Sequence, residues 1–244
     1  MIDGGEVKTV SGRGIEAAAS NVDARVENKI SALAPEQLAI VRRGAEIIKS
    51  GGLVAFPTET VYGLGANALD AEAVRRIYET KGRPSDNPLI LHVSSIEMTE
   101  GLVELNWRSR MLMEKFWPGP LSIVLPAKEV IPSRTRGGLP TAAVRMPDAA
   151  VALALIKFSN LPIAAPSANI SGRPSPTDAE TVRRAVGDTT PLVIDGGETR
   201  LRVEQPVLNM PSAPAPPPRP RRRATHHTAG PHVNTRDLPT ASTA

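Results

Sequence analysis

Segments with the hydrophobic spacing of helices alternate with short apolar runs along most of this chain of 244 residues. Apolar residues from Leu38 to Ile48 recur at the spacing of a helix face, whereas 53–56 is typical of a buried strand. Such alternation favours one α/β domain with a twisted, mixed (parallel and antiparallel) sheet flanked by helices. The expected strands are 53–56, 89–93, 121–125, 162–165 and 192–194, and the expected helices lie near 35–50, 70–82, 108–116, 148–156 and 177–187.

Several helix ends have sequence signals of their own. Asp70 and Asp148 are expected N-caps, because an aspartate carboxylate accepts hydrogen bonds from the free N–H groups of a first turn. Thr177 and Glu180 have the spacing of a capping box. Gly82 is expected to end the helix that Asp70 begins.

The two ends of the chain differ in composition from its centre. Residues 1–30 are polar with weak periodicity, which predicts a mobile N-terminal leader. Residues 211–244 are rich in proline and arginine, so they bury too little apolar surface to offset the entropy of ordering, and we expect a disordered tail. The folded domain is therefore expected over residues 31–210.

Charge and composition exclude several classes of protein. The five Arg and one Asp from Ser212 onward account for the whole net charge of +4, so the rest of the chain is neutral and predicts no basic binding face. The aromatic share of 3% leaves few platforms for stacking nucleic-acid bases. Absence of cysteine excludes disulfides and thiolate metal sites, and no apolar run indicates a signal peptide or membrane span. A cytoplasmic protein with no membrane contact and no protein-held metal is expected.

Two segments, 57–65 and 81–88, set hydroxyls or cations among glycines and prolines. We interpret both as loops whose restricted backbone can aim polar groups at a ligand. Lys81 and Arg83 would repel each other unless an anion such as phosphate or carboxylate lies between them. The alternative for these two residues is an ordinary solvated helix end.

Four further residues allow either a functional or a structural interpretation. Ser167 and Asn169 directly follow an expected strand, which is where open α/β sheets often place ligand contacts, although turn chemistry also favours such residues. His92 lies inside an expected strand, and Arg145 ends an apolar run. Each could be a hydrogen-bonded structural residue or part of a site.

Five sequence strings, taken together, carry a family resemblance: FPTETVYGLG (56–65), KGRPSDNPLILHV (81–93), FWPGPLSIVLP (116–126), AVRMP (143–147) and PSANISGRPSPT (166–177). In this order and spacing they resemble the YrdC/Sua5 family of threonylcarbamoyl-AMP synthases, over about Pro35 to Gly197. The resemblance implies a YrdC-like domain that makes L-threonylcarbamoyladenylate and pyrophosphate from L-threonine, bicarbonate and ATP with Mg²⁺. The product would supply a partner transferase that modifies adenosine 37 of tRNA to t6A, with at most a weak tRNA contact by this protein.

The same resemblance implies residue roles. Thr60 and His92 would contact L-threonine, Arg145 would hold its carboxylate, and His92 could also relay a proton. A polar tetrad around nucleotide and carbamate would consist of Lys81, Arg83, Ser167 and Asn169. The nucleotide contacts would come from Arg83, Asn87, Thr141, Asn169 and Ser175.

The chain departs from the family pattern after Gly197. Gln205 and Pro206 stand where family members have serine and threonine, and Pro206 removes a backbone donor from an expected strand. Beyond Met210 an arginine-proline-glycine turn has no counterpart. These changes predict a weakened ATP site.

Divergence, a truncated or frame-shifted end and a degenerate paralogue all fit these departures. A paralogue without synthesis would act as an RNA-binding or scaffold protein through Arg219–Arg223, or as a small-nucleotide binding module.

Overall fold

One mixed sheet forms the centre of the fold. The computed structural model describes residues 12–199 and 206–210, and side chains from residue 21 onward. Its strands are β1 (Val54–Pro57), β2 (Tyr62–Asn67), β3 (Ile90–His92), β4 (Ser122–Pro126), β5 (Thr141–Arg145), β6 (Ile163–Ala164), β7 (Leu192–Val193) and β8 (Val207–Asn209).

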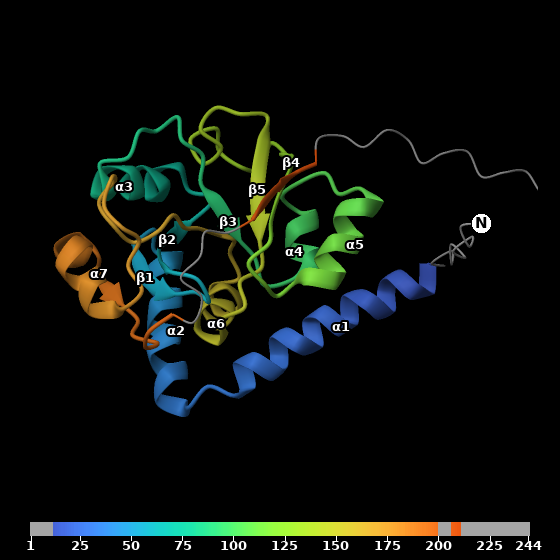
Figure 1. Cartoon of the computed structure of the whole chain (residues 1–244), viewed down its shortest axis with the longest axis horizontal. Helices are drawn as coiled ribbons and strands as arrows, with labels where there is room; N and C mark the ends of the chain where they lie inside the picture. Colours follow the sequence, from blue (N-terminus) through green and yellow to red (C-terminus); the bar gives the residue numbers. More distant parts are fainter. Residues whose placement is uncertain (1–11, 200–205, 211–244) are drawn as a thin grey trace, which may run out of the picture. The chain divides into compact units, whose positions relative to one another are not determined.

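The strands lie in the order β7-β1-β2-β6-β3-β5-β4-β8 (Figure 1). The pairs β1/β7, β3/β5 and β4/β8 are parallel, and the other neighbouring pairs are antiparallel. The prediction of a mixed sheet within an α/β domain is therefore confirmed.

Helices cover the sheet, and most of them match the predicted spacing. Asp70 accepts hydrogen bonds from Glu72 N and Ala73 N at the start of α3, and Gly82 ends that helix with φ 58°. The helices are α1 (Gly12–Ser31), α2 (Pro35–Lys49), α3 (Ala71–Lys81), α4 (Ile96–Glu100), α5 (Trp107–Phe116), α6 (Ala150–Ser159) and α7 (Ala179–Val186), followed by the short 3₁₀ helix η1 (Gly187–Thr189).

Two predicted helix caps are wrong. Asp178, rather than Thr177, caps α7 by accepting from Thr181 N. The N-cap of α6 is Ala149, which makes no side-chain bond. Asp148 instead pairs with Lys29 of α1 at 2.7 Å, and this charge partner from another helix draws its carboxylate away from the helix end.

The predicted mobile leader is also wrong for residues 12–30, which form most of α1. Val22, Val26 and Ile30 recur every fourth residue and are buried, and α1 runs alongside α6 toward α5 (Figure 1). Arg25 Nη2 also donates to Glu114 O of α5 at 2.7 Å. Packing against other helices stabilises this segment although its own sequence is polar.

The segment 57–65, predicted to be a loop, is largely a hairpin. Strands β1 and β2 pair through Phe56–Gly63 and Val54–Gly65, and only residues 58–61 connect them. The two glycines of β2 interrupt the apolar pattern by which a strand is recognised in the sequence. The packing requires the second of them, Gly65. A Cβ at Gly65 would lie 2.6 Å from Phe56 Cε1 and 2.7 Å from Ile163 Cγ2.

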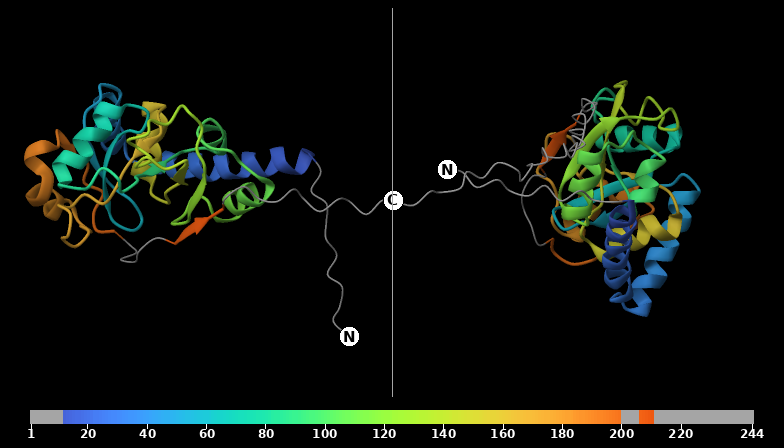
Figure 2. Two further views of the ribbon diagram at one scale, coloured as in Figure 1. Left: turned by 90° about the horizontal axis from the view of Figure 1, so that it is seen from above. Right: turned by 90° about the vertical axis from the view of Figure 1, so that its right-hand side faces the viewer.

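Strand β8 lies beside β4 at the sheet edge (Figure 2). The expected disruption by Pro206 does not occur, because β8 begins one residue later and the Pro206 carbonyl accepts from Ser122 N at 3.0 Å. The lost N–H therefore lies outside the strand. Gln205, the Arg219–Arg223 cluster and the predicted tail over 211–244 lie outside the described residues.

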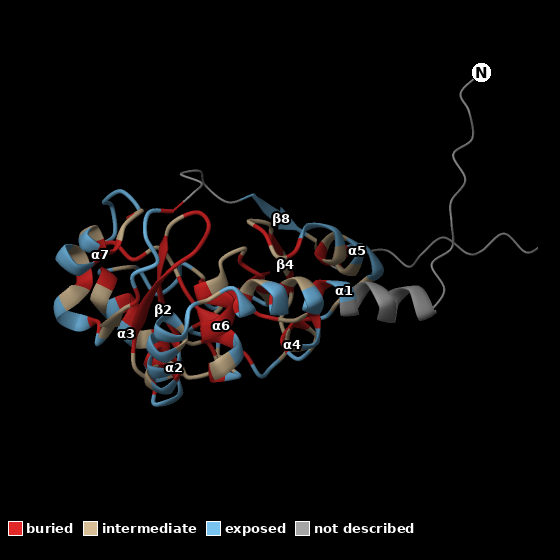
Figure 3. Ribbon diagram, turned by 90° about the horizontal axis from the view of Figure 1, so that it is seen from below, coloured by how far each residue is buried: buried red, intermediate tan, exposed pale blue. Residues whose placement is uncertain are grey.

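The core lies between the sheet and helices α2 and α6. Every residue of α6 from Val151 to Ile156 is buried, whereas α2 and the described part of α1 keep an exposed outer face (Figure 3). Among the helices described, none combines the length and apolarity needed to span a bilayer.

Candidate active site

The first group of predicted site residues meets at the end of α3. Lys81 is the last residue of this helix, and its side chain is buried. Its Nζ donates to Ser167 O at 2.5 Å and to Asn169 O, and it lies 3.4 Å from Asn169 Oδ1. The structure thus brings together three members of the predicted tetrad, from segments more than eighty residues apart.

Lys81 is a buried cation without an ion pair among the residues described. Burial, with a smaller effect of the nearby positive charge of Arg83, lowers the pKa of its ammonium from 10.5 to about 8. The carbonyl oxygens solvate the ammonium but carry no net charge. The positive charge therefore remains available to an anionic ligand.

The loop after β6 is held in shape by its own polar groups. Ser167 Oγ donates to Asn169 Oδ1 at 2.5 Å, while Asn169 Nδ2 donates to Ile170 O at 2.9 Å and to Arg173 O at 2.6 Å. Asn169 and Ser175 also line a pocket of about 590 Å³. Sequence reasoning missed the other polar side chains at this pocket, which are Arg173, Thr177, Asp178, Thr181 and Arg184.

The remaining nucleotide candidates lie less close together. Arg83 Nη2 donates to Pro88 O at 3.3 Å, and Arg83 Nε donates to Asn87 O at 3.4 Å, so Arg83 spans its own loop. Burial lowers the pKa of its guanidinium. Thr141 begins β5 opposite Pro126, and no hydrogen bond from its side chain to these groups is found within the described residues. Its nucleotide role stays a prediction.

The second group surrounds Arg145 at the end of β5. Arg145 Nη2 lies 2.7 Å from Glu59 Oε1, and both side chains are buried. The same nitrogen donates to Thr60 Oγ1 at 3.4 Å. The geometry therefore joins Arg145 to the β1–β2 connection, where Thr60 was predicted to contact a substrate.

His92 lies next to Arg145 in the register of β3 and β5. Its ring packs edge-on against Phe56 with ring centres 6.2 Å apart. Burial, with a smaller effect of the Arg145 charge, lowers the pKa of His92 from 6.5 to about 3, so the imidazole is neutral near pH 7.

Several polar atoms around Arg145 have no hydrogen-bond partner among the residues that the structure describes. Three of them, His92 Nδ1, Arg145 Nη1 and Ser122 Oγ, belong to a row of residues on three neighbouring strands. Buried polar groups are rarely left unpaired in a protein, so this row is suited to bind a small polar ligand.

Strand β2 connects the two groups. Gly63 of β2 pairs with Ser167, and Ala168 N donates to Tyr62 O at 2.8 Å. Tyr62 Oη in turn donates to Gly197 O at 2.7 Å and accepts from Gly196 N at 3.2 Å. The cationic group and the Arg145 group are thus held on one scaffold of backbone hydrogen bonds.

Comparison with known families decides what this scaffold is. The model of the Sua5/YciO/YrdC family, described as telomere recombination, matches residues 46–222. The chain belongs to this family. Its membership confirms the resemblance found in the sequence, and the match includes every predicted site residue.

Two relatives within the Sua5/YciO/YrdC family are named threonylcarbamoyl-AMP synthase. The protein from Pyrococcus abyssi is 57% identical over 171 residues, which are 70% of this chain and 50% of the relative. That from Bacillus subtilis is 50% identical over 171 residues, 69% of this chain and 49% of the relative. The chain therefore spans about half the length of both relatives.

The fold agrees with a solved structure of the same family. P. abyssi Sua5 complexed with L-threonine matches with a TM-score of 0.69 and 57% identity, over 70% of this chain and 50% of that one.

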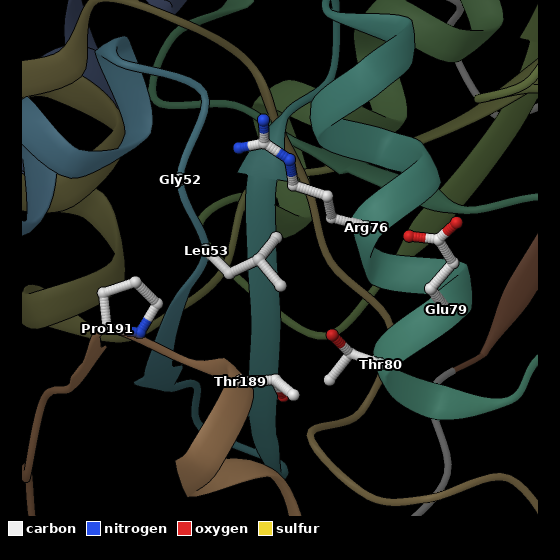
Figure 4. A pocket seen from close by; sticks show the side chains of 7 residues that line it. All are labelled: Gly52, Leu53, Arg76, Glu79, Thr80, Thr189 and Pro191. Atoms are coloured by element: carbon white, nitrogen blue, oxygen red, sulfur yellow. The ribbon is translucent and has the colours of Figure 1, made fainter.

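A further pocket is lined by α3 and by residues next to β1 and β7. It has a volume of about 520 Å³ and contains none of the predicted site residues (Figure 4). Arg76, which lines it, donates from Nη1 to Gly51 O at 2.9 Å, so this polar group is used within the fold. The other lining residues are Gly52, Leu53, Glu79, Thr80, Thr189 and Pro191.

Sequence reasoning missed Glu59 and Ser122 as members of the Arg145 group. Glu59 lies within the FPTETVYGLG string, where a carboxylate between two threonines was a usable signal. Ser122 had no such signal, because only the pairing of β4 with β5 places it beside Arg145.

Proposed function

We propose that this chain is a threonylcarbamoyl-AMP synthase, a nucleotidyltransferase that makes L-threonylcarbamoyladenylate from L-threonine, bicarbonate and ATP. The observation that carries the proposal is that two buried polar groups are both connected to β2 or to the residues just before it. One is the cationic Lys81 group, and the other is the Arg145 group with open donors and acceptors. The names of the relatives support the same activity.

The Arg145 group suits the amino acid. The guanidinium of Arg145 would bind the carboxylate of L-threonine, and Thr60 and His92 would contact the remaining polar groups. The amine then condenses with bicarbonate, releasing water and forming a carbamate. The Nδ1 atom of a neutral His92 can accept or donate one hydrogen bond, depending on the tautomer. Because the pKa of His92 is low, its imidazole is a weak base and holds a transferred proton poorly.

The Lys81 group suits the nucleotide. The carbamate oxygen attacks the α-phosphorus of ATP while the bond to pyrophosphate breaks, and negative charge gathers on the phosphate oxygens. Lys81 and Arg83 would stabilise that charge, with Ser167 and Asn169 holding Lys81 in place. Asn87, Thr141 and Ser175 would add contacts to the nucleotide.

We expect Mg²⁺ to enter bound to the ATP phosphates, where it neutralises charge during the transfer. Residues 12–199 and 206–210 contain no cluster of three or more His, Asp or Glu side chains that could hold a metal ion. The adenylate would pass to a t6A transferase acting on tRNA in the cytoplasm, with at most weak RNA contact by this chain.

The direct test is synthesis by the purified full chain. Incubation with L-threonine, bicarbonate, ATP and Mg²⁺ should release pyrophosphate and form the adenylate in equal amounts, detected by mass spectrometry. Omission of threonine should abolish both products. Release of pyrophosphate without the adenylate, or no reaction at all, would contradict the proposed function.

A further inference from the structure

The role proposed for Arg145 leaves one member of its group unused, the carboxylate of Glu59. The side chains of Arg145 and Glu59 are exposed by only 0% and 2%. Glu59 comes from the connection between β1 and β2, whereas Arg145 ends β5. Two charges this deeply buried are tolerated only as a pair, so Glu59 is the internal counter-ion of Arg145.

This pairing leaves part of the guanidinium open. Glu59 Oε1 and Thr60 Oγ1 both lie at Nη2, the first at 2.7 Å and the second at 3.4 Å. Arg145 Nη1 has no hydrogen-bond partner within residues 12–199 and 206–210, and neither does the hydroxyl of Ser122 next to it in register. A ligand carboxylate bound at Nη1 would therefore not have to displace Glu59.

The charges of the group limit which ligand is favoured. Within the Arg145 group itself, Arg145 and Glu59 cancel, His92 is neutral at pH 7, and Thr60 and Ser122 carry no charge. Two further carboxylates, Glu198 and the Asp148 that pairs with Lys29, line the pocket at Glu59, so they bring no positive charge to it. Lys81 belongs to the other group, where main-chain oxygens hold its ammonium. A carboxylate ligand would leave the Arg145 group with a net negative charge unless it brought its own cation.

We propose that Glu59 sets the ligand preference of this site. As the internal counter-ion of Arg145, it makes the site select an α-amino acid zwitterion over the same carboxylic acid without its amino group. The inference rests on the proposed function, because it takes the Arg145 group as the threonine site. It adds a specificity-determining residue to that site.

The test compares two ligands in two proteins. The affinities of L-threonine and of (R)-3-hydroxybutyrate, its analogue without the amino group, are measured by calorimetry on the full chain and on Glu59→Gln. The unaltered chain should prefer threonine, and Glu59→Gln should reduce that preference by at least about tenfold. In Glu59→Gln, threonine should bind more weakly than in the unaltered chain, and the analogue should bind equally well or more tightly.

Control variants separate charge from packing. Glu59→Asp keeps the charge on a shorter side chain, so it should retain the preference even if both ligands bind less tightly. Glu36→Gln removes an exposed carboxylate of α2 and should change neither affinity. ATP affinity and circular dichroism check that each variant is folded.

The outcomes distinguish this inference from the proposed function. If the unaltered chain binds no threonine, the proposed function fails, and the inference that depends on it fails too. If the unaltered chain binds threonine but Glu59→Gln weakens both ligands equally, Glu59 is a packing residue and the inference alone is overturned. An unchanged preference in Glu59→Gln overturns it as well.

Discussion

At the scale of single residues, Lys81 is a buried cation in the part of the site that we propose for the nucleotide. Main-chain oxygens of Ser167 and Asn169 surround its ammonium. A lysine in such a place keeps its charge with difficulty, and its pKa of about 8 lies close to neutral pH. The charge that would stabilise the phosphates is therefore sensitive to mild changes of pH.

Turnover should fall as the pH rises through about 8, because Lys81 loses its proton there rather than at 10.5. Initial rates of pyrophosphate release measure this. Lys81→Arg, whose guanidinium stays protonated, should remove the alkaline decline even if its rate is lower. Lys81→Ala should lower kcat/KM by at least about 100-fold, whereas Lys115→Ala on the exposed side of α5 should not. An identical alkaline decline in Lys81→Arg would show that another group titrates.

At the scale of elements, α1 and β2 are among the features that the hydrophobic pattern did not predict, as are α4 and β5. In the part of α1 whose side chains are described, Val22, Val26 and Ile30 are buried in the core, and the helix meets both α5 and α6. The strand β2 brings the Lys81 and Arg145 groups together. Both elements depend on close contact with partners that are distant in the sequence.

Val26→Asp should destabilise the fold by about 3 kcal/mol or more, because it buries an unpaired carboxylate between α1 and the core. Chemical denaturation measures the change. Ala24→Asp is the matched control, since position 24 is exposed on the same helix and should cost less than about 1 kcal/mol. Equal stability of the two variants would mean that α1 does not pack in solution.

Gly65→Ala should destabilise the hairpin by about 1 to 3 kcal/mol, because its methyl group would overlap Phe56 and Ile163. Gly187→Ala serves as the control, since the nearest atom to its added Cβ is 3.8 Å away. Thermal unfolding compares the two. If Gly65→Ala is as stable as Gly187→Ala, the hairpin has more space than the structure shows.

At the scale of the whole molecule, the chain spans about half of its relatives' length and departs from the family pattern before β8. The edge strand β8 forms in spite of Pro206. That Gln205 and Pro206 weaken ATP binding therefore stays a prediction. Because β8 forms, any such weakening would not come from loss of the strand.

A chimera tests that separation. Replacing residues 200–206 by the aligned segment of the Bacillus subtilis relative should raise ATP affinity by about tenfold, if small hydroxyls next to phosphate restore lost hydrogen bonds. Calorimetry with ATP measures the change. The same chimera carrying Lys81→Ala should stay inactive. Unchanged affinity in the chimera would show that residues 205 and 206 do not weaken the ATP site.

The sequence by itself determined the α/β class, the position of α3 through Asp70 and Gly82, and the family, because these depend on local spacing and on short strings of residues. It also named Lys81, Ser167 and Asn169 as one group, and the structure brings them together. Only the tertiary structure decided that α1 is packed, that Glu59 pairs with Arg145 and that Ser122 lies beside it. Those contacts follow from the order and register of strands far apart in the chain, which local patterns do not specify.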